Sequence, residues 1–207
     1  MLDLQFNITT FGSQKAEKRA LLLHGLMGTG AVFFKVADKL VKDGYVSVLC
    51  VDPTALRYKR VDCPDLLGHG WAPHTPPYTI KALAKHLADN LSESYDVIGG
   101  VSFGSTIAAA LYPLLASRPS RLVLGEPLLD HPPFDEDKIQ GAVDGTKNIP
   151  SEDEIMKANP TWIRAEATLR RLSLTQIDPR AIRELFEVCL YALLLEMQFP
   201  LTNIGRQ

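Results

Sequence analysis

Apolar and polar residues alternate in two distinct ways along the first 130 positions. Short apolar runs bounded by charges or glycines predict strands covered on both faces; they lie at residues 20–25, 96–101 and 121–125. Apolar residues spaced three or four positions apart predict amphipathic helices; they lie at residues 32–40, 80–91 and 106–115. Pro113 should end the last of these helices early. Residues 2–8 alternate apolar and polar side chains and predict a half-buried strand. Strands that alternate with helices indicate an α/β fold with a mostly parallel sheet and helices on both faces.

The last third of the chain has a purely helical pattern. Ser151 and Glu154 have the spacing of a capping box, residues 162–174 are amphipathic, and Pro179 opens a helix that should run to about residue 195. No strand is predicted there. We therefore divide the chain into residues 1–132, which hold the sheet, and residues 133–207, a helical region beside it.

Composition and charge narrow the possible partners. The chain has 207 residues, and its 22 Lys plus Arg against 24 Asp plus Glu give a net charge of −2, so nucleic acid and anionic membranes are not expected partners. Cys50, Cys63 and Cys189 have unrelated spacings that suit neither a disulfide framework nor a metal site. No secretory signal or membrane-spanning run is visible. We expect a soluble, cytoplasmic protein that needs no metal or cofactor.

The main chemical signal is the segment Gly100-Val101-Ser102-Phe103-Gly104. It follows a predicted strand and opens a predicted helix, which is the setting of a nucleophile elbow, a sharp turn that exposes a reactive serine. Glycines on either side of Ser102 would remove side chains that collide with the neighbouring strand and helix. The alternative is a glycine-rich turn with an uninvolved serine.

A second signal is the turn from His24 to Gly30, directly after a buried strand. Such a turn can supply one backbone N–H of an oxyanion hole, here that of Leu26, to be paired with the N–H of Phe103. His24 could be a general base, but we expect it to support the loop by hydrogen bonding.

Four segments within residues 20 to about 130 have a familiar order: LLLHGLMGTG, PDLLGHG, YDVIGGVSFGSTIA and RLVLGEP. With them the chain resembles the α/β-hydrolase superfamily. The resemblance implies the α/β-hydrolase fold with a helical cap, and a triad in which Ser102 attacks a carbonyl, a histidine takes its proton and a carboxylate orients the histidine. A serine at the elbow implies ester or lactone chemistry through an acyl-enzyme.

The resemblance also suggests the acid of the triad. Glu126 ends the strand after the nucleophile helix, 24 positions after Ser102, which is similar to its place in fungal zearalenone-type lactonases. Asp130 is the reserve candidate. The alternative for Glu126 is an exposed carboxylate at a strand end.

The base of the triad is missing from the predicted site. The superfamily places its histidine after the last strand, and no histidine follows His131 here. We expect His69 on a loop near the pocket mouth and His74 and His86 at the surface, and His131 on the loop after Glu126 is not assigned a role.

Two anomalies suggest an interrupted chain. Eighteen residues, 46–63, stand where one strand of about five would do, and the chain ends before the strands and histidine that the resemblance implies. Our hypothesis is a gene product with a retained intron at about 46–62 and a premature end, nearly inactive as written. The alternative is a genuine insertion, with Arg57, Lys59 and Arg60 on a solvated loop.

The predicted function is therefore hydrolysis of a carboxylic ester or lactone of a small apolar molecule. We expect an apolar lid over Ser102, made by Phe134, Trp162, Ile163, Leu169 and Leu172, although such residues also serve simply to pack a helix. The alternatives are a non-catalytic ligand-binding protein on the same fold, as in the plant hormone receptors that resemble hydrolases, and a nonfunctional fragment.

Overall fold

A five-stranded sheet forms the centre of the protein. The computed structural model describes residues 6–43, 60–127 and 134–187. The strands are β1 (Ile8–Gly12), β2 (Arg19–Leu23), β3 (Arg60–Pro64), β4 (Val97–Val101) and β5 (Arg121–Gly125). Their order is β1-β3-β2-β4-β5, and all neighbours run parallel except β1, which is antiparallel to β3. The predicted mostly parallel sheet is confirmed.

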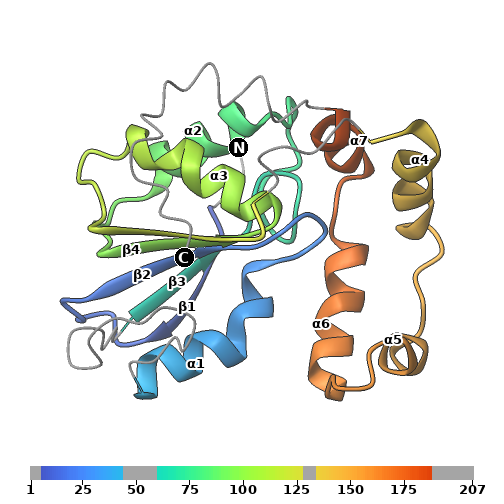
Figure 1. The fold of residues 1–207 in the computed structure, drawn as a ribbon, viewed down its shortest axis with the longest axis horizontal. Coiled ribbons are helices and arrows are strands. Elements are labelled where there is room, and N and C mark those ends of the chain that lie inside the picture. The colour runs from blue at the N-terminus through green and yellow to red at the C-terminus, as the bar shows by residue number, and fades with distance from the viewer. Residues whose placement is uncertain (1–5, 44–59, 128–133, 188–207) are drawn as a thin grey trace, which may run out of the picture.

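Helices cover both faces of this sheet (Figure 1). The short 3-10 helix η1 (Gly30–Phe33) and α1 (Phe34–Asp43) lie on one face, and α2 (Ile80–Asn90) and α3 (Phe103–Leu111) lie on the other. After α3 the chain tightens into the 3-10 helix η2 (Tyr112–Leu114), so the α-helix ends just ahead of Pro113 as predicted.

The two faces of the sheet bury separate apolar clusters. Leu21 and Leu23 of β2 point into the larger cluster, under α2 and α3, whereas Ala20 points into the smaller one, against α1. Because β2 is covered on both faces, it needs the unbroken apolar run seen in the sequence.

Strand β1 lies later in the chain than its alternation predicted. The prediction was residues 2–8, of which 1–5 lie outside the described residues, and the observed strand is Ile8–Gly12. Its position is determined by pairing with β3, from Ile8 opposite Pro64 to Gly12 opposite Arg60. The decisive information is therefore in the partner strand and not in the local pattern.

Strand β3 includes the last positions of the proposed insertion. Residues 60–62 pair with β1 and β2, so Arg60 is not on a solvated loop; its Nε donates to Asp62 Oδ1 at 2.9 Å. Buried Asp62 also accepts hydrogen bonds from Thr10 and Tyr95. Residues 44–59, with Cys50, Arg57 and Lys59, lie outside the described residues.

A helical cap stands to one side of the sheet (Figure 1). It consists of α4 (Glu136–Gly145), α5 (Glu152–Ala158), α6 (Arg164–Thr175) and α7 (Pro179–Glu187). The predicted capping box is present at the start of α5. As predicted, residues 134–187 contain no strand.

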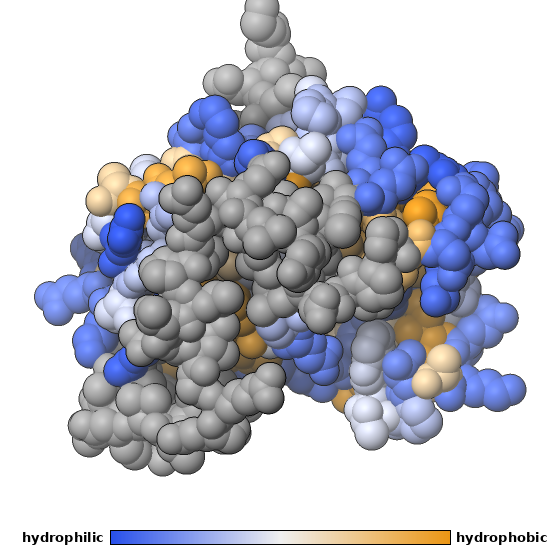
Figure 2. All heavy atoms as spheres, turned by 45° about the horizontal axis from the view of Figure 1, so that its top comes forward, coloured by the Kyte–Doolittle hydropathy of each residue, from blue (hydrophilic) through white to orange (hydrophobic). Residues whose placement is uncertain are grey.

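The cap is tied to the core just before α7. The N–H of Asp178 donates to the Gly68 carbonyl at 2.8 Å, and the Tyr78 hydroxyl donates to the Asp178 carboxylate at 2.7 Å. Hydrophilic residues cover most of the outer side of the cap, on the right of Figure 2. None of the described helices has both the length and the apolar character needed to cross a membrane.

Candidate functional site

Ser102 lies at a strained turn between β4 and α3. Its φ is +54° and its ψ is −125°, a conformation that residues with a Cβ rarely adopt. The turn is held to β5, because the Ser102 N–H donates to the Gly125 carbonyl at 2.8 Å. The Ser105 hydroxyl lies between two strand ends, 2.7 Å from the Gly100 carbonyl and 2.8 Å from that of Gly125. These hydrogen bonds offset the strain and hold Ser102 at the carboxyl end of the sheet.

The glycines of the turn have the steric role that the sequence suggests. A Cβ on Gly100 would lie 2.2 Å from the Gly104 carbonyl oxygen, and a Cβ on Gly104 would lie 2.1 Å from that of Leu23. Side chains at these positions would separate α3 from β4 and β2. The turn can therefore be this sharp only with glycine on both sides.

The loop after β2 lies directly beside Ser102. A Cβ on Gly25 would lie 3.9 Å from Ser102 Oγ. The loop then turns at Met27, whose φ is +60°, and the Gly28 N–H donates to the Gly25 carbonyl at 3.1 Å. Leu26, predicted as one oxyanion-hole donor, stands in this loop, and Phe103, the other, is the first residue of α3, whose N–H has no partner within the helix.

His24 supports this loop, as predicted. It is fully buried, its Nδ1 lies 2.8 Å from the Gly25 carbonyl oxygen, and its Nε2 accepts the Leu66 N–H at 3.1 Å. Since Nε2 is an acceptor, Nδ1 carries the proton and the ring is neutral. Burial lowers the pKa of His24 to about 4. Both nitrogens are occupied, so His24 is not available to a substrate.

The expectation for His69 is confirmed only for its place on a loop. It does not lie at a pocket mouth but is fully buried, with its ring centroid 5.2 Å from that of His24. Its Nδ1 lies 3.0 Å from the Leu67 carbonyl oxygen, whereas Nε2 is buried without a partner among the described residues. Burial, with a smaller effect from His24, lowers the pKa of His69 to about 3.

The other described histidines are His74 and His86. His74 is exposed, as predicted. His86 is only half at the surface, because its ring packs edge-on against Phe6 at a centroid distance of 5.6 Å. Among the described residues, no histidine hydrogen bonds to Ser102 or to Glu126.

Glu126 lies next to the elbow on the neighbouring strand. Val101 of β4 and Gly125 of β5 are register partners, so Ser102 and Glu126 follow the ends of adjacent parallel strands. Glu126 shares the unusual backbone of Ser102, with φ +51°, and its side chain is exposed. Asp130 and His131 lie outside the described residues.

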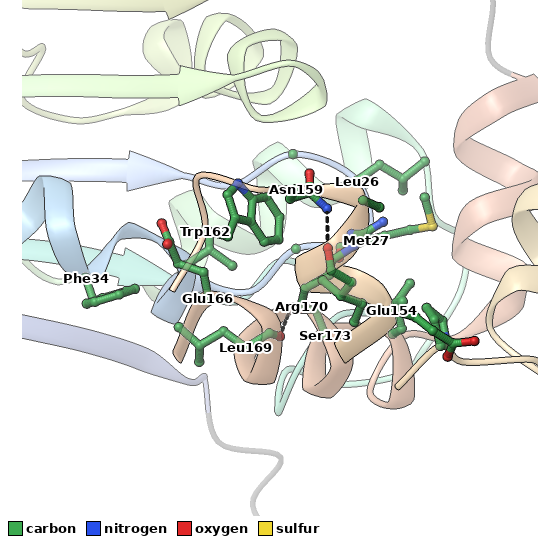
Figure 3. A pocket seen from close by; sticks show the side chains of 17 residues that line it. Leu26, Met27, Phe34, Glu154, Asn159, Trp162, Glu166, Leu169, Arg170 and Ser173 are labelled. Atoms are coloured by element: carbon green, nitrogen blue, oxygen red, sulfur yellow. Dashed lines mark hydrogen bonds between the residues drawn. The ribbon is translucent and has the colours of Figure 1, made fainter. Parts of the chain in front are cut away.

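A cavity of about 660 Å³ lies between the loop after β2 and the cap (Figure 3). Gly25 to Gly28, with Val32 and Phe34, form its wall on the core side, and α5, α6 and the turn between them form the other. Trp162 and Leu169 line it. Ser102 itself does not, but Gly25 contacts both the cavity and Ser102.

The residues predicted to form an apolar lid differ in their positions, and a lid of Trp162 and Leu169 over Ser102 stays a prediction. Ile163 and Leu172 are 49% and 46% exposed, because they stand on the outer side of the cap. Phe134 packs on Phe186 at a centroid distance of 4.4 Å, and Phe186 packs on Phe103 at 5.9 Å. Phe186, which no sequence signal singled out, thus connects α7 to the residue after Ser102.

Asp65 is a second residue that the sequence analysis did not assign. It is 2% exposed, and it accepts hydrogen bonds from Asn7 Nδ2, the Gly30 N–H and the Trp71 N–H at 2.7, 2.8 and 3.0 Å. It therefore connects β1, the start of η1 and the turn after β3. Its place directly after a strand in PDLLGHG is the only signal that could have identified it.

We expect Asp65→Ala to lower the free energy of unfolding by about 3 kcal/mol, because three donors lose a charged acceptor. Urea unfolding at neutral pH would measure it. Asp89→Ala is the matched control: Asp89 is exposed and pairs with Lys85, and such pairs contribute about 0.5 kcal/mol. Equal losses in the two variants would contradict the role given to Asp65.

The described residues contain no group of three or more His, Cys, Asp or Glu placed to hold a metal ion. Cys63 is buried in the core, and burial raises the pKa of its thiol.

Comparison with known proteins agrees with the observed fold. The profile of the Alpha/beta hydrolase family matches residues 20–201. The chain belongs to this family. A curated member, Lipase LipV of Mycobacterium tuberculosis, is 29% identical over 152 residues, which are 70% of this chain and 51% of the lipase. The chain thus spans about half the length of that relative.

Solved structures of hydrolases show the same fold. The N-formylmaleamic acid deformylase Nfo of Pseudomonas putida superposes with a TM-score of 0.63 at 22% identity, covering 86% of this chain and 67% of the deformylase. The thioesterase domain of the curacin biosynthetic pathway superposes with a TM-score of 0.59 at 19% identity, covering 93% and 75% of the two chains.

Proposed function

We propose that this chain is a serine hydrolase for carboxylic esters or lactones of small, largely apolar molecules, with Ser102 as the nucleophile. The observation that supports this best is the backbone of Ser102, φ +54°, between two glycines whose close contacts permit no side chain. Such strain costs about 1–3 kcal/mol and is concentrated at functional sites. The lipase and the thioesterase among its relatives act, by their names, on esters and thioesters.

In the proposed reaction Ser102 Oγ attacks the substrate carbonyl carbon. The N–H groups of Leu26 and Phe103 then hold the oxyanion, helped by the positive end of the α3 dipole. Collapse of the tetrahedral intermediate breaks the bond to the leaving oxygen, which takes up, through water, the proton lost by Ser102. An ester then releases its alcohol, whereas a lactone keeps the alcohol tethered to the acyl group. Water hydrolyses the acyl-enzyme and returns a proton to Ser102 Oγ. Glu126 is the proposed acid, and Trp162 the proposed substrate contact in the cavity.

The proposed site has no general base that can be identified among the described residues. None of the described histidines hydrogen bonds to Ser102, and His24 and His69 are buried away from solvent. We expect turnover by the 207-residue chain to be slow, at the level that an oxyanion hole and binding supply without a complete triad, about 10³–10⁴-fold over the uncatalysed reaction.

A fluorophosphonate probe tests the nucleophile, because it reacts only with an activated serine. We expect slow labelling of the wild-type protein, complete loss in Ser102→Ala, and unchanged labelling in Ser120→Ala, a matched change at an exposed serine far from the elbow. Intact-protein mass spectrometry would measure the adduct. Labelling that persists in Ser102→Ala would refute the assignment.

The absence of a described histidine at Ser102 favours a second candidate, a non-catalytic binding protein on the same fold. Folded wild-type protein that stays unlabelled, yet binds a small molecule in the cavity, would support that alternative over the hydrolase.

A further inference from the structure

Arg170 crosses the cap cavity from α6 to the loop after β2. Its Nη1 donates to the Met27 carbonyl oxygen at 2.9 Å, and Figure 3 shows the side chain extended toward Met27. A guanidinium has five N–H donors in a planar fork, and this hydrogen bond uses one. Among the described residues, Arg170 has no ion pair.

The carboxylates that line the same cavity are already engaged elsewhere. Glu154 accepts the Ser151 N–H at 2.8 Å in the capping box of α5. Glu166 accepts the Ile163 N–H at 2.8 Å and forms an ion pair with Lys35 Nζ at 2.7 Å. The cavity wall therefore carries one cation that no described carboxylate neutralises.

Burial without a carboxylate partner distinguishes Arg170 from the other described arginines whose pKa is shifted. Removal from water lowers the pKa of the Arg170 guanidinium. Carboxylates instead raise the pKa of the other perturbed arginines, which are Arg60, Arg164, Arg180 and Arg183. A partly buried cation without a counter-ion is unfavourable, so an anion that entered the cavity would gain from pairing with it.

The remainder of the cavity is mainly apolar. Its lining includes Leu26, Phe34, Ile155, Trp162 and Leu169. A volume of about 660 Å³ is in the range of small-molecule sites, which combine apolar walls with a few polar groups that orient the ligand.

We propose that this cavity binds a small apolar molecule bearing a carboxylate, with the Arg170 guanidinium on the carboxylate and Trp162 beside the apolar body. The planar fork of arginine matches the two oxygens of a carboxylate. Because Trp162 is also the substrate contact of the proposed hydrolase, this inference rests on that proposal for its biological meaning and names a ligand class for the same cavity. Binding itself needs no catalysis, because Ser102 does not line the cavity, so it can be tested separately.

Trp162 offers a direct readout. Trp71 is 75% exposed, so Trp71→Phe leaves Trp162 as the single tryptophan reporter with little effect on the fold. In that background we would titrate 4-phenylbutyrate and its neutral counterpart 4-phenylbutyramide, following Trp162 fluorescence. We expect the carboxylate to bind about tenfold or more tightly than the amide, as one charge-assisted interaction allows.

Adding Arg170→Met should remove that preference, with weaker carboxylate binding and amide binding within about twofold. Arg171→Met is the matched control, since Arg171 is the exposed neighbour on α6 and should keep the preference. Arg170→Gln repeats the test with a polar side chain if the Met variant does not fold. Equal binding of the two probes, no binding of either, or equal effects at Arg170 and Arg171 would overturn the proposal.

A Ser102→Ala variant separates this proposal from the hydrolase. It should keep the carboxylate preference, because the serine is not part of the cavity. If Ser102→Ala loses fluorophosphonate labelling but still binds the carboxylate, the nucleophile and the cavity are tested separately. Loss of carboxylate binding in Ser102→Ala would show that the cavity depends on Ser102, against the proposal.

Discussion

Gly104→Ala is expected to lower the free energy of unfolding by about 3 kcal/mol or more, a large part of the stability of a domain of this size. The new methyl group would stand 2.1 Å from the Leu23 carbonyl oxygen and 2.5 Å from that of His24. Both are backbone atoms at the end of the central strand β2, so neither can move without disturbing the sheet. Urea unfolding followed by circular dichroism would measure the loss.

A second glycine-to-alanine substitution, in a helix where the new methyl group has free space, is the control for Gly104→Ala. Gly141 lies inside α4, and a Cβ placed there meets no atom within 4 Å. Gly141→Ala should therefore stabilise the protein by about 0.5–1 kcal/mol, the helix-propensity difference between the two residues. If Gly104→Ala unfolds at the same urea concentration as the wild-type protein, α3 cannot lie as close to β2 as described.

The local pattern was sufficient where a residue's role depends on its own segment. The buried run of β2, the early end of α3 before Pro113 and the capping box of α5 all follow from neighbouring residues, and all are confirmed. His24 was also interpreted correctly, because a histidine between a buried strand and a glycine turn has backbone partners within reach.

Positions that depend on distant segments could not be predicted in this way. His69 stands in a turn between two glycines and is predicted to lie near a pocket mouth, yet the segment folds back under the start of α7, where the Asp178 N–H donates to the Gly68 carbonyl. Ile163 and Leu172 belong to the amphipathic segment 162–174, but only the packing of α6 against α5 decides which side of this segment meets the cavity. Likewise, Arg170 lacks an ion pair within the described part of the chain because Glu154 and Glu166 find their partners elsewhere.

The buried pair His24 and His69 should make the protein sensitive to mild acid. In the folded state the pKa is about 4 for His24 and about 3 for His69, both below the ordinary 6.5. At a pH below 6.5 and above these folded-state values, the unfolded chain therefore binds more protons than the folded one. The stabilisation from keeping both rings neutral is complete above pH 6.5 and is lost as the pH falls toward 4 and below. For His24 alone the loss amounts to about 3 kcal/mol.

We expect the free energy of unfolding, measured in urea at steps between pH 7.5 and 4, to fall steeply below pH 6.5 in the wild-type protein. His69→Asn should flatten that fall by about half, because asparagine can still donate to the Leu67 carbonyl but does not titrate. Ser120→Ala, a change at an exposed serine, should leave the slope unchanged. Burial raises the pKa of the Asp178 carboxyl, but hydrogen bonds from Arg180 and Tyr78 lower it more, to about 2. Asp178 therefore loses its contribution to the free energy of unfolding only below pH 4, outside this window. A wild-type profile that is flat from pH 6.5 to 4 would show that folding lowers the pKa of neither ring, which contradicts the effect expected from their burial.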